Sequence, residues 1–245
     1  MTKMTLTKRQ VNILKSIISE FINTAHPVGS VTLYEKYDLG ISPATLRAEM
    51  AKLVKEGFLH KAHSSSGRIP TTLGLRFFLD EILKEEKLDK VNETQLKEKL
   101  FQSRFHKDKF IKESVKALSQ LSNHAAISLV DDVIFAYGLG QLIAQPEFED
   151  IALLQNALNI IESESLLNSI FEKFNNDHTL KTLIGDEIGV NTLSECSIVF
   201  SPFNFFRGSK GYIAVVGPRR MRYSRVIPAV RTVSEFIEDS IRGWE

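Results

Sequence analysis

The segment from Ser42 to Gly57 constrains the fold more than any other stretch of this chain. Ser42 can accept a hydrogen bond from an amide left free at a helix start, and Pro43 suits the first helical position because no donor is needed there. Gly57 supplies a stop after Glu56. At 100° per residue the apolar side chains of this helix share one side, which must be buried. They are Leu46, Met50, Leu53 and Val54.

Two shorter signals predict helices before this one. Thr7 and Gln10 form a capping-box pattern, and the apolar residues that follow at helical spacing predict a helix over 8–24. "HPVGS" ends it, and Ser30 is expected to cap a second helix over 31–37. The inward side chains of the second helix are expected to be Leu33 and Tyr34.

The outward face of the helix at 43–56 carries small residues near its start and lysines further on. Such a face suits the major groove of DNA, since small side chains permit close approach and ammonium groups meet phosphates. Arg47 flanks this face and could reach a guanine edge or a phosphate. For an isolated helix, a solvated surface is the competing interpretation. The outward residues are Ala44, Thr45, Ala48, Lys52 and Lys55.

The next segment predicts a β-hairpin. "FLHKAH" alternates apolar and polar residues as an edge strand does, "SSSG" is a turn, and "RIPT" begins a return strand. Three helices followed by a hairpin is the order of a winged helix-turn-helix domain, whose hairpin tip would contact the same sugar-phosphate backbone as the third helix. The residues presented there would be His63, Ser64, Ser65, Ser66 and Arg68.

Enzymatic readings of this segment lack their required residues. A phosphate-binding P-loop needs a Gly-rich turn that enters a helix with a following Lys, and Gly67 sits at a hairpin instead. His60 and His63 lie on opposite sides of a strand with no third ligand nearby, which disfavours a metal site. The sequence therefore predicts no catalytic, cofactor-binding or metal-binding residues.

Charge is divided unevenly along the chain. Residues 1–76 hold 11 Lys and Arg against 5 Asp and Glu, whereas the remainder holds 20 against 25. A positive N-terminal part suits a polyanionic partner, although chance could produce this split. The single cysteine, Cys196, cannot form an internal disulfide, and no apolar run reaches the ~18 residues of a membrane span. A cytoplasmic, non-membrane protein is expected.

The rest of the chain predicts mixed structure. Residues 72–122 are expected to be helical, with two apolar stripes that either form core or pair two protomers. Strands are expected at 125–130, 196–203 and 211–216, and helices at 149–162, 165–174 and 223–241, which together predict an α+β domain. The loop "GPRRMR" at 217–222 could bind an anion at a helix start or only connect two elements. Cys196 is expected to be buried.

Several stretches together resemble the heat-inducible transcription repressor family, HrcA. Each is short, and their order and spacing make the combination specific. They are "PVGS" (27–30), "GISPATLRAEM" (40–50), "HSSSGRIPT" (63–71), "LRFFLD" (75–80), "QPEFED" (145–150), "LIGDE" (183–187) and "GPRRMRYSRVIPAV" (217–230).

The resemblance implies a homodimeric winged-helix repressor of chaperone genes. Such a protein binds an inverted-repeat operator, is kept active by a GroEL-type chaperonin, and releases its genes during heat stress. It implies a DNA-binding domain over 1–76, a helical linker or dimerisation region over 77–122, and a GAF-like regulatory domain over 123–245. Ser42, Thr45 and Arg47 occupy matching positions in the reading helix. The alternative is a regulator that senses a small molecule through its C-terminal domain.

The chain departs from the family pattern at three places. Ala48 stands where the family has Asn, which removes one potential hydrogen bond to a base edge. Arg219 and Arg222 replace Thr and Asp, which makes that loop unusually basic. The chain is also shorter, because "NHAAISLV" runs almost directly into "DDVIFAYGLGQLIAQPEF", so the GAF-like domain is expected to be truncated.

Overall fold

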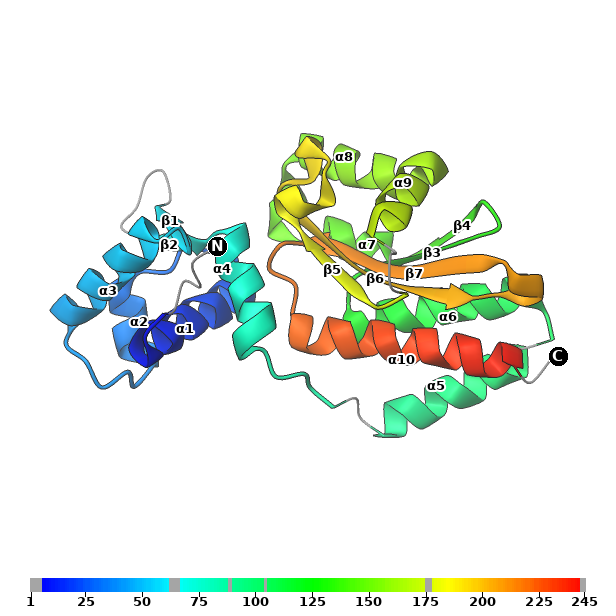
Figure 1. Cartoon of the computed structure of the whole chain (residues 1–245), viewed down its shortest axis with the longest axis horizontal. Helices are drawn as coiled ribbons and strands as arrows, with labels where there is room; N and C mark the ends of the chain where they lie inside the picture. Colours follow the sequence, from blue (N-terminus) through cyan, green and yellow to red (C-terminus); the bar gives the residue numbers. More distant parts are fainter. Residues whose placement is uncertain (1–5, 62–66, 88–89, 104, 175–177, 243–245) are drawn as a thin grey trace. The chain divides into compact units, whose positions relative to one another are not determined.

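The computed structural model describes residues 6–61, 67–87, 90–103, 105–174 and 178–242. The chain divides into two compact units, Met1–Lys84 and Glu85–Glu245. Helices occur in both units, and the second contains a five-stranded antiparallel sheet (Figure 1). The predicted α+β class is therefore confirmed.

The first unit consists of three helices, a small hairpin and a further helical segment. Its core is formed by apolar side chains of the helices and of the chain entering the hairpin, including Ile13, Leu14, Leu33, Leu46, Leu53 and Phe58. The elements are α1 (Lys8–Thr24), α2 (Ser30–Lys36), α3 (Pro43–Lys55), β1 (Leu59–Lys61), β2 (Arg68–Pro70), α4 (Thr72–Phe77) and the π-helical turn η1 (Phe78–Ile82).

Local signals placed α1 and α3 correctly. Thr7 and Gln10 form the predicted capping box at α1, and Ser42 caps α3 with Pro43 in the first turn. Gly57 follows α3 with a φ of +82°, a left-handed conformation that glycine adopts without strain. Leu46, Met50 and Leu53 are buried as predicted, while Val54 is only partly buried.

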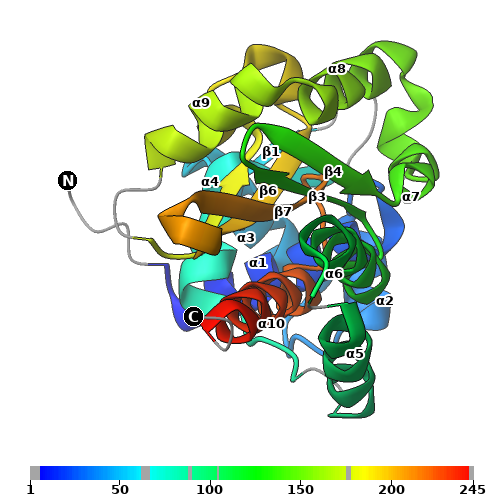
Figure 2. The same cartoon turned by 90° about the vertical axis from the view of Figure 1, so that its right-hand side faces the viewer.

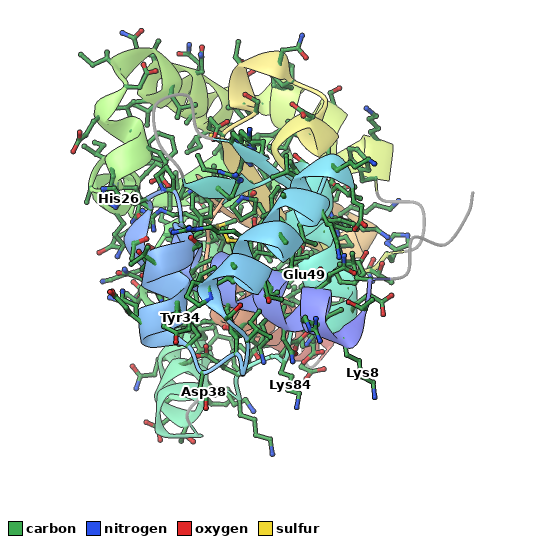
Figure 3. The ribbon with its side chains drawn as sticks, turned by 90° about the vertical axis from the view of Figure 1, so that its left-hand side faces the viewer. Lys8, His26, Tyr34, Asp38, Glu49 and Lys84 are labelled. Atoms are coloured by element: carbon green, nitrogen blue, oxygen red, sulfur yellow. The ribbon has the colours of Figure 1, made fainter. Side chains whose placement is uncertain are left out.

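Two predictions for α2 are wrong. Gly29, not Ser30, is the N-cap, and Ser30 is the first helical residue. Tyr34 does not turn inward, since it is 53% exposed and lies at the surface of α2 (Figure 3). A helix of two turns buries one narrow stripe, and Leu33 alone occupies it.

The segment after the hairpin packs tightly against it. An added Cβ on Gly74 would lie 2.2 Å from the carbonyl oxygen of Phe58. Only glycine at position 74 therefore allows α4 to lie this close to the chain that enters the hairpin. The rings of Phe58 and Phe77 meet edge to face with centroids 5.4 Å apart. The first of the two apolar stripes expected over 72–122 was to begin at Leu73, but Leu73 is exposed and Leu75 is buried.

The second unit is built on a sheet of strand order β4-β3-β7-β6-β5, in which every pairing is antiparallel. Its strands are β3 (Ala125–Val130), β4 (Val133–Tyr137), β5 (Lys181–Ile184), β6 (Cys196–Asn204) and β7 (Lys210–Pro218). Its α-helices are α5 (Lys90–Ser103), α6 (Lys107–Ser122), α7 (Leu139–Ile143), α8 (Ile151–Glu162), α9 (Glu164–Phe174) and α10 (Tyr223–Arg242). Short 3-10 turns lie at η2 (Pro146–Glu149), η3 (Gly185–Ile188), η4 (Asn191–Leu193) and η5 (Phe206–Gly208).

Helices cover both faces of this sheet. In Figures 1 and 2, α8 and α9 lie on one side of the strands, and α6 and α10 lie on the other. The α8 and α9 side encloses a core that includes Ile127, Phe171, Ile198 and Phe200. On the opposite side, the apolar face of the predicted helix α10 is buried throughout: Val226, Val230, Val233, Ile237 and Ile241.

The predicted strands and long helices of this unit are present, but β4, β5 and α7 were not predicted. These elements span only four or five residues, too few to show a period. The expected helix at 149–162 begins at Ile151, because η2 occupies the preceding residues. The apolar stripe of α5 and α6 is buried within the chain at Leu100, Phe110 and Leu118, which favours the core interpretation over pairing of protomers.

Candidate nucleic-acid interface

The start of α3 is held by its own polar side chains. The Oγ of Ser42 accepts a hydrogen bond from the Thr45 amide at 3.2 Å, and it lies 3.0 Å from the Thr45 hydroxyl. Ser42 is exposed and Thr45 partly so. The N-cap and the first turn of α3 therefore present two hydroxyl groups. They lie at the N-terminal end of the helix, where the partial positive charge of the helix dipole favours an anion.

Arg47 is held by a residue of the preceding helix. Its Nε donates to the Oγ of Ser30 at 3.2 Å, and its side chain is exposed. The contact joins α2 to α3 across 17 positions of sequence. It orients the guanidinium while leaving its terminal nitrogens toward solvent.

The two lysines of the outward face differ in their surroundings. Lys52 Nζ lies 3.0 Å from a carboxylate oxygen of Glu49, which is only 8% exposed and is labelled on α3 in Figure 3. Lys55 is exposed and contacts no acidic side chain in the described part of the chain. The Glu49 carboxylate offsets the charge of Lys52. The charge of Lys55 has no such partner among the described residues, so Lys55 should attract an external anion more strongly than Lys52 does.

The base of the hairpin is joined to the turn before α2. Val28 and Arg68 exchange backbone hydrogen bonds, each 2.9 Å long. Gly67 lies so close to Pro27 that an added Cβ would be 2.7 Å from the proline Cβ. Arg68 is half-buried, and its Nη1 donates to the Gly67 carbonyl at 3.2 Å. Two motif segments, 27–30 and 63–71, therefore meet here, and the bond from Arg47 to Ser30 links the first of them to the third, 40–50.

Part of the predicted site lies outside the described residues. His63, Ser64 and Ser65, expected at the hairpin tip, fall within 62–66, as does Ser66. The structure brings Ser42, Thr45, Arg47, Lys52 and Lys55 together on α3, and places Arg68 at the hairpin base. Ser30 and Glu49 were missed as partners of the site. The i,i+3 spacing of Glu49 and Lys52 could have indicated that pair.

The basic loop at 217–222 is neutralised from within the chain. The guanidinium of Arg220 contacts both carboxylate oxygens of Glu147, at 2.5 and 3.0 Å, and also the side-chain oxygen of Gln145 at 3.1 Å. Arg219 pairs with Glu195 at 3.3 Å. The chain's own carboxylates thus occupy the position of the anion that this loop could have bound, which favours its role as a structural connection.

Two further findings concern the described residues only. Within them, no three His, Cys, Asp or Glu side chains cluster closely enough to hold a metal ion. No helix among them combines the length and the apolar character needed to cross a membrane.

Fold and site define a two-unit α+β protein, in which a three-helix unit exposes a cationic helix and precedes a larger antiparallel-sheet unit. The family model described as the HrcA protein C terminal domain matches residues 71–227. The chain belongs to the HrcA family, as the resemblance of its motifs predicted.

Curated relatives extend the match over nearly the whole chain. A heat-inducible transcription repressor HrcA of Pelotomaculum thermopropionicum is 24% identical over 345 residues, covering 98% of this chain and 99% of the relative. That of Bacillus pumilus is 27% identical over 339 residues, covering 96% and 98%. Both alignments are much longer than the 245 residues present here, so this chain is a shortened member.

Among the solved structures similar to this chain is one with the same fold. It is the crystal structure of a hypothetical protein at 2.2 Å resolution, with a TM-score of 0.80 and 18% sequence identity. The match covers 96% of this chain and 100% of the other.

Proposed function

We propose that this protein is a DNA-binding transcription repressor of heat-inducible genes. The observation that carries the proposal is the division of α3 into a buried apolar side and an exposed side with hydroxyl and cationic groups. The names of the curated relatives support the same function. No residue is assigned a catalytic role.

The N-terminal unit acts in this proposal as a winged helix-turn-helix domain. The α2–turn–α3 segment is the helix-turn-helix, and the β1–β2 hairpin is the wing. Arg47 reaches a base edge, with Thr45 beside it, and Ser42 places the helix start near a phosphate. Lys52 and Lys55 meet phosphates. Arg68 supports the base of the wing, whose tip would present His63, Ser64 and Ser65.

The C-terminal unit is assigned the regulatory role. Its antiparallel sheet with helices on both faces is consistent with a GAF-like domain. We propose that the protein works in the cytoplasm as a homodimer on an inverted repeat, because two reading helices then meet successive half-sites. Support by a GroEL-type chaperonin, withdrawn during heat stress, is the proposed switch. A fold of this kind does not by itself specify a ligand.

Salt-dependent binding tests the proposal. Affinity for a duplex carrying the inverted repeat from upstream of the organism's own chaperone genes should fall with salt, with a log–log slope of about −0.9 per phosphate contact. Lys55→Ala should make this slope shallower by roughly one contact in each protomer. Lys52→Ala should change it less, because Glu49 already offsets that charge.

Lys15→Ala is the matched control, since it removes the same charge from an exposed position of α1. It should leave the slope nearly unchanged. A protein that binds no duplex even at very low salt, or an equal effect of all three substitutions, would contradict the proposed interface.

A further inference from the structure

Tyr34 on α2 is an exposed aromatic residue whose hydroxyl group bonds to nothing in the described part of the chain (Figure 3). Its side chain is 53% exposed. Three other tyrosines, Tyr37, Tyr212 and Tyr223, each donate the hydroxyl hydrogen to another side chain. An exposed aromatic ring with an available donor suits contact with another molecule.

The two flanks of α2 are marked by contacts to different helices. Lys36 Nζ lies 2.5 Å from a carboxylate oxygen of Glu20, so the Lys36 flank faces α1. The Ser30 hydroxyl accepts the hydrogen bond from Arg47 Nε, so the Ser30 flank faces α3. Around the helix axis, Tyr34 lies about 40° from Ser30 and about 160° from Lys36. Tyr34 is therefore on the α3 side of α2.

Tyr34 also lines a hollow beside the turn that joins the two helices. This hollow has a volume of about 540 Å³ and extends from Tyr34 to Ser42, the N-cap of α3. Glu35 and Asp38 line it as well. Their negative charges repel a phosphate from the turn itself, so a phosphate approaches the α2–α3 boundary more favourably from the Arg47 end. An uncharged donor such as the tyrosine hydroxyl can bind it between these regions.

The size of the major groove determines what α2 meets when α3 binds DNA. The groove is about 12 Å wide, and an α-helix with its side chains is about 10–12 Å across, so α3 fills it. The first helix of a helix-turn-helix then crosses the sugar-phosphate backbone that borders the groove. In this protein that helix is α2, which packs against α3. A side chain on the α3 side of α2 therefore meets phosphates.

We infer that the Tyr34 hydroxyl donates a hydrogen bond to a phosphate oxygen of the strand that borders the groove next to α2. The inference deepens the proposed function and rests on it. Tyrosine side chains are among the groups that contact phosphates, and such contacts fix register without carrying sequence information. Tyr34 thus sets the position of α3 in the groove, while Arg47 reads a base edge.

Tyr34→Phe tests the contact, because it removes the hydroxyl and keeps the ring. The variant should bind the operator and a scrambled duplex more weakly by the same factor, roughly tenfold. The hydroxyl is uncharged and displaces no counterion, so the slope of log affinity against log salt should equal that of the wild type. An altered slope, or a loss confined to the operator, would overturn the inference, since either would mean that lysine contacts or base reading had changed.

Tyr137→Phe is the matched control. Tyr137 is 43% exposed, lies on β4 of the second unit, and has no hydroxyl partner among the described residues. Its substitution should leave both affinities unchanged. Fluorescence anisotropy with labelled duplexes measures binding by the full chain, and circular dichroism verifies folding. A Tyr34→Phe protein that binds both duplexes as the wild type does overturns the inference alone, whereas a wild type that binds neither duplex refutes the proposed function itself.

A second measurement locates the phosphate. A set of operator duplexes, each with a single methylphosphonate that replaces one charged phosphate oxygen by a methyl group, is bound to the wild type and to Tyr34→Phe. At one position in each half-site, the methylphosphonate should cost the wild type more affinity than the variant, because the variant has already lost the bond there. Equal losses for the two proteins at every position overturn the inference.

Discussion

Arg47 is positioned by one hydrogen bond that the local sequence does not reveal. Its Nε uses the hydroxyl of Ser30, and its terminal nitrogens remain available for a base edge or a phosphate. A guanidinium already oriented loses less freedom on binding. Ser30 is therefore a positioning residue for the proposed contact.

Arg47→Ala should weaken binding to the operator by about 1–3 kcal/mol and relax the sequence preference at one base pair. Ser30→Ala should weaken binding to the operator less than Arg47→Ala does, and it should leave the sequence preference at that base pair unchanged. Competition gel shifts with operator and scrambled duplexes measure both. An Arg47→Ala protein that discriminates as well as the wild type would rule out base reading.

His124 makes stability depend on pH. It is 8% exposed, and burial, aided by the nearby Arg220 and Arg225, lowers its pKa to about 4. Between pH 4 and 6.5 the unfolded chain takes up a proton at this site that the folded chain does not, so stability falls as pH falls through this window. Across the whole window, this one histidine lowers the free energy of unfolding by about 3 kcal/mol.

Urea unfolding at pH 7, 6, 5 and 4 measures this slope. His124→Leu removes the titrating group. The free energy of unfolding of this variant should therefore change less between pH 6.5 and pH 4 than that of the wild type. A wild-type slope that survives the substitution would assign the pH dependence to other groups.

At the scale of elements, α10 contains a proline without breaking. Pro228 has no amide to donate to the carbonyl of Ser224, one turn earlier. The amide of Glu86 donates to that carbonyl at 2.8 Å, and the Ser224 hydroxyl donates to the Glu86 carboxylate at 2.6 Å. Arg231 pairs with Glu85 and thereby lowers the pKa of its carboxyl group. The proline thus provides an acceptor that anchors the start of the second unit.

Pro228→Ala should restore a helical amide that competes with Glu86 for this carbonyl. We expect amide hydrogen exchange at Glu86 to become faster. Exchange at Val233, beyond the affected turn, should stay the same. Unchanged protection at Glu86 would show that the carbonyl accepts both bonds.

Several elements were predictable because their signals are local. α1 and α3 begin at side-chain caps, and α10 repeats its apolar residues over five turns. β4 and β5 have no such signal, since strands of four or five residues gain their identity from the neighbours they pair with. Tyr34 was wrongly expected to be buried, because the sequence of a two-turn helix is too short to show which of its sides faces the core.

At the scale of the whole molecule, an ion pair joins two segments of the second unit that are far apart in the sequence. Arg220 and Glu147 are 73 positions apart, and both side chains are largely buried. Their pairing joins η2 to the loop between β7 and α10. It also brings together two motif segments, 145–150 and 217–230.

Arg220→Gln should destabilise the protein by about 3–5 kcal/mol, because a largely buried carboxylate loses its partner. Replacing both residues, with Arg220→Met and Glu147→Leu, should recover much of this loss. Urea unfolding of the single and double variants forms the test. Equal destabilisation in both would contradict a direct pairing effect.

The sequence by itself determined the positions of α1, α3 and α10, the uneven distribution of charge and the family, because caps, periodicity and motif order are properties of neighbouring residues. Only the tertiary structure decided that Ser30 holds Arg47, that Glu49 offsets Lys52, that Arg220 meets Glu147 and that β4 ends the sheet. Each of these depends on which surfaces meet after the chain has folded. Packing sets those contacts, and no pattern within one segment contains them.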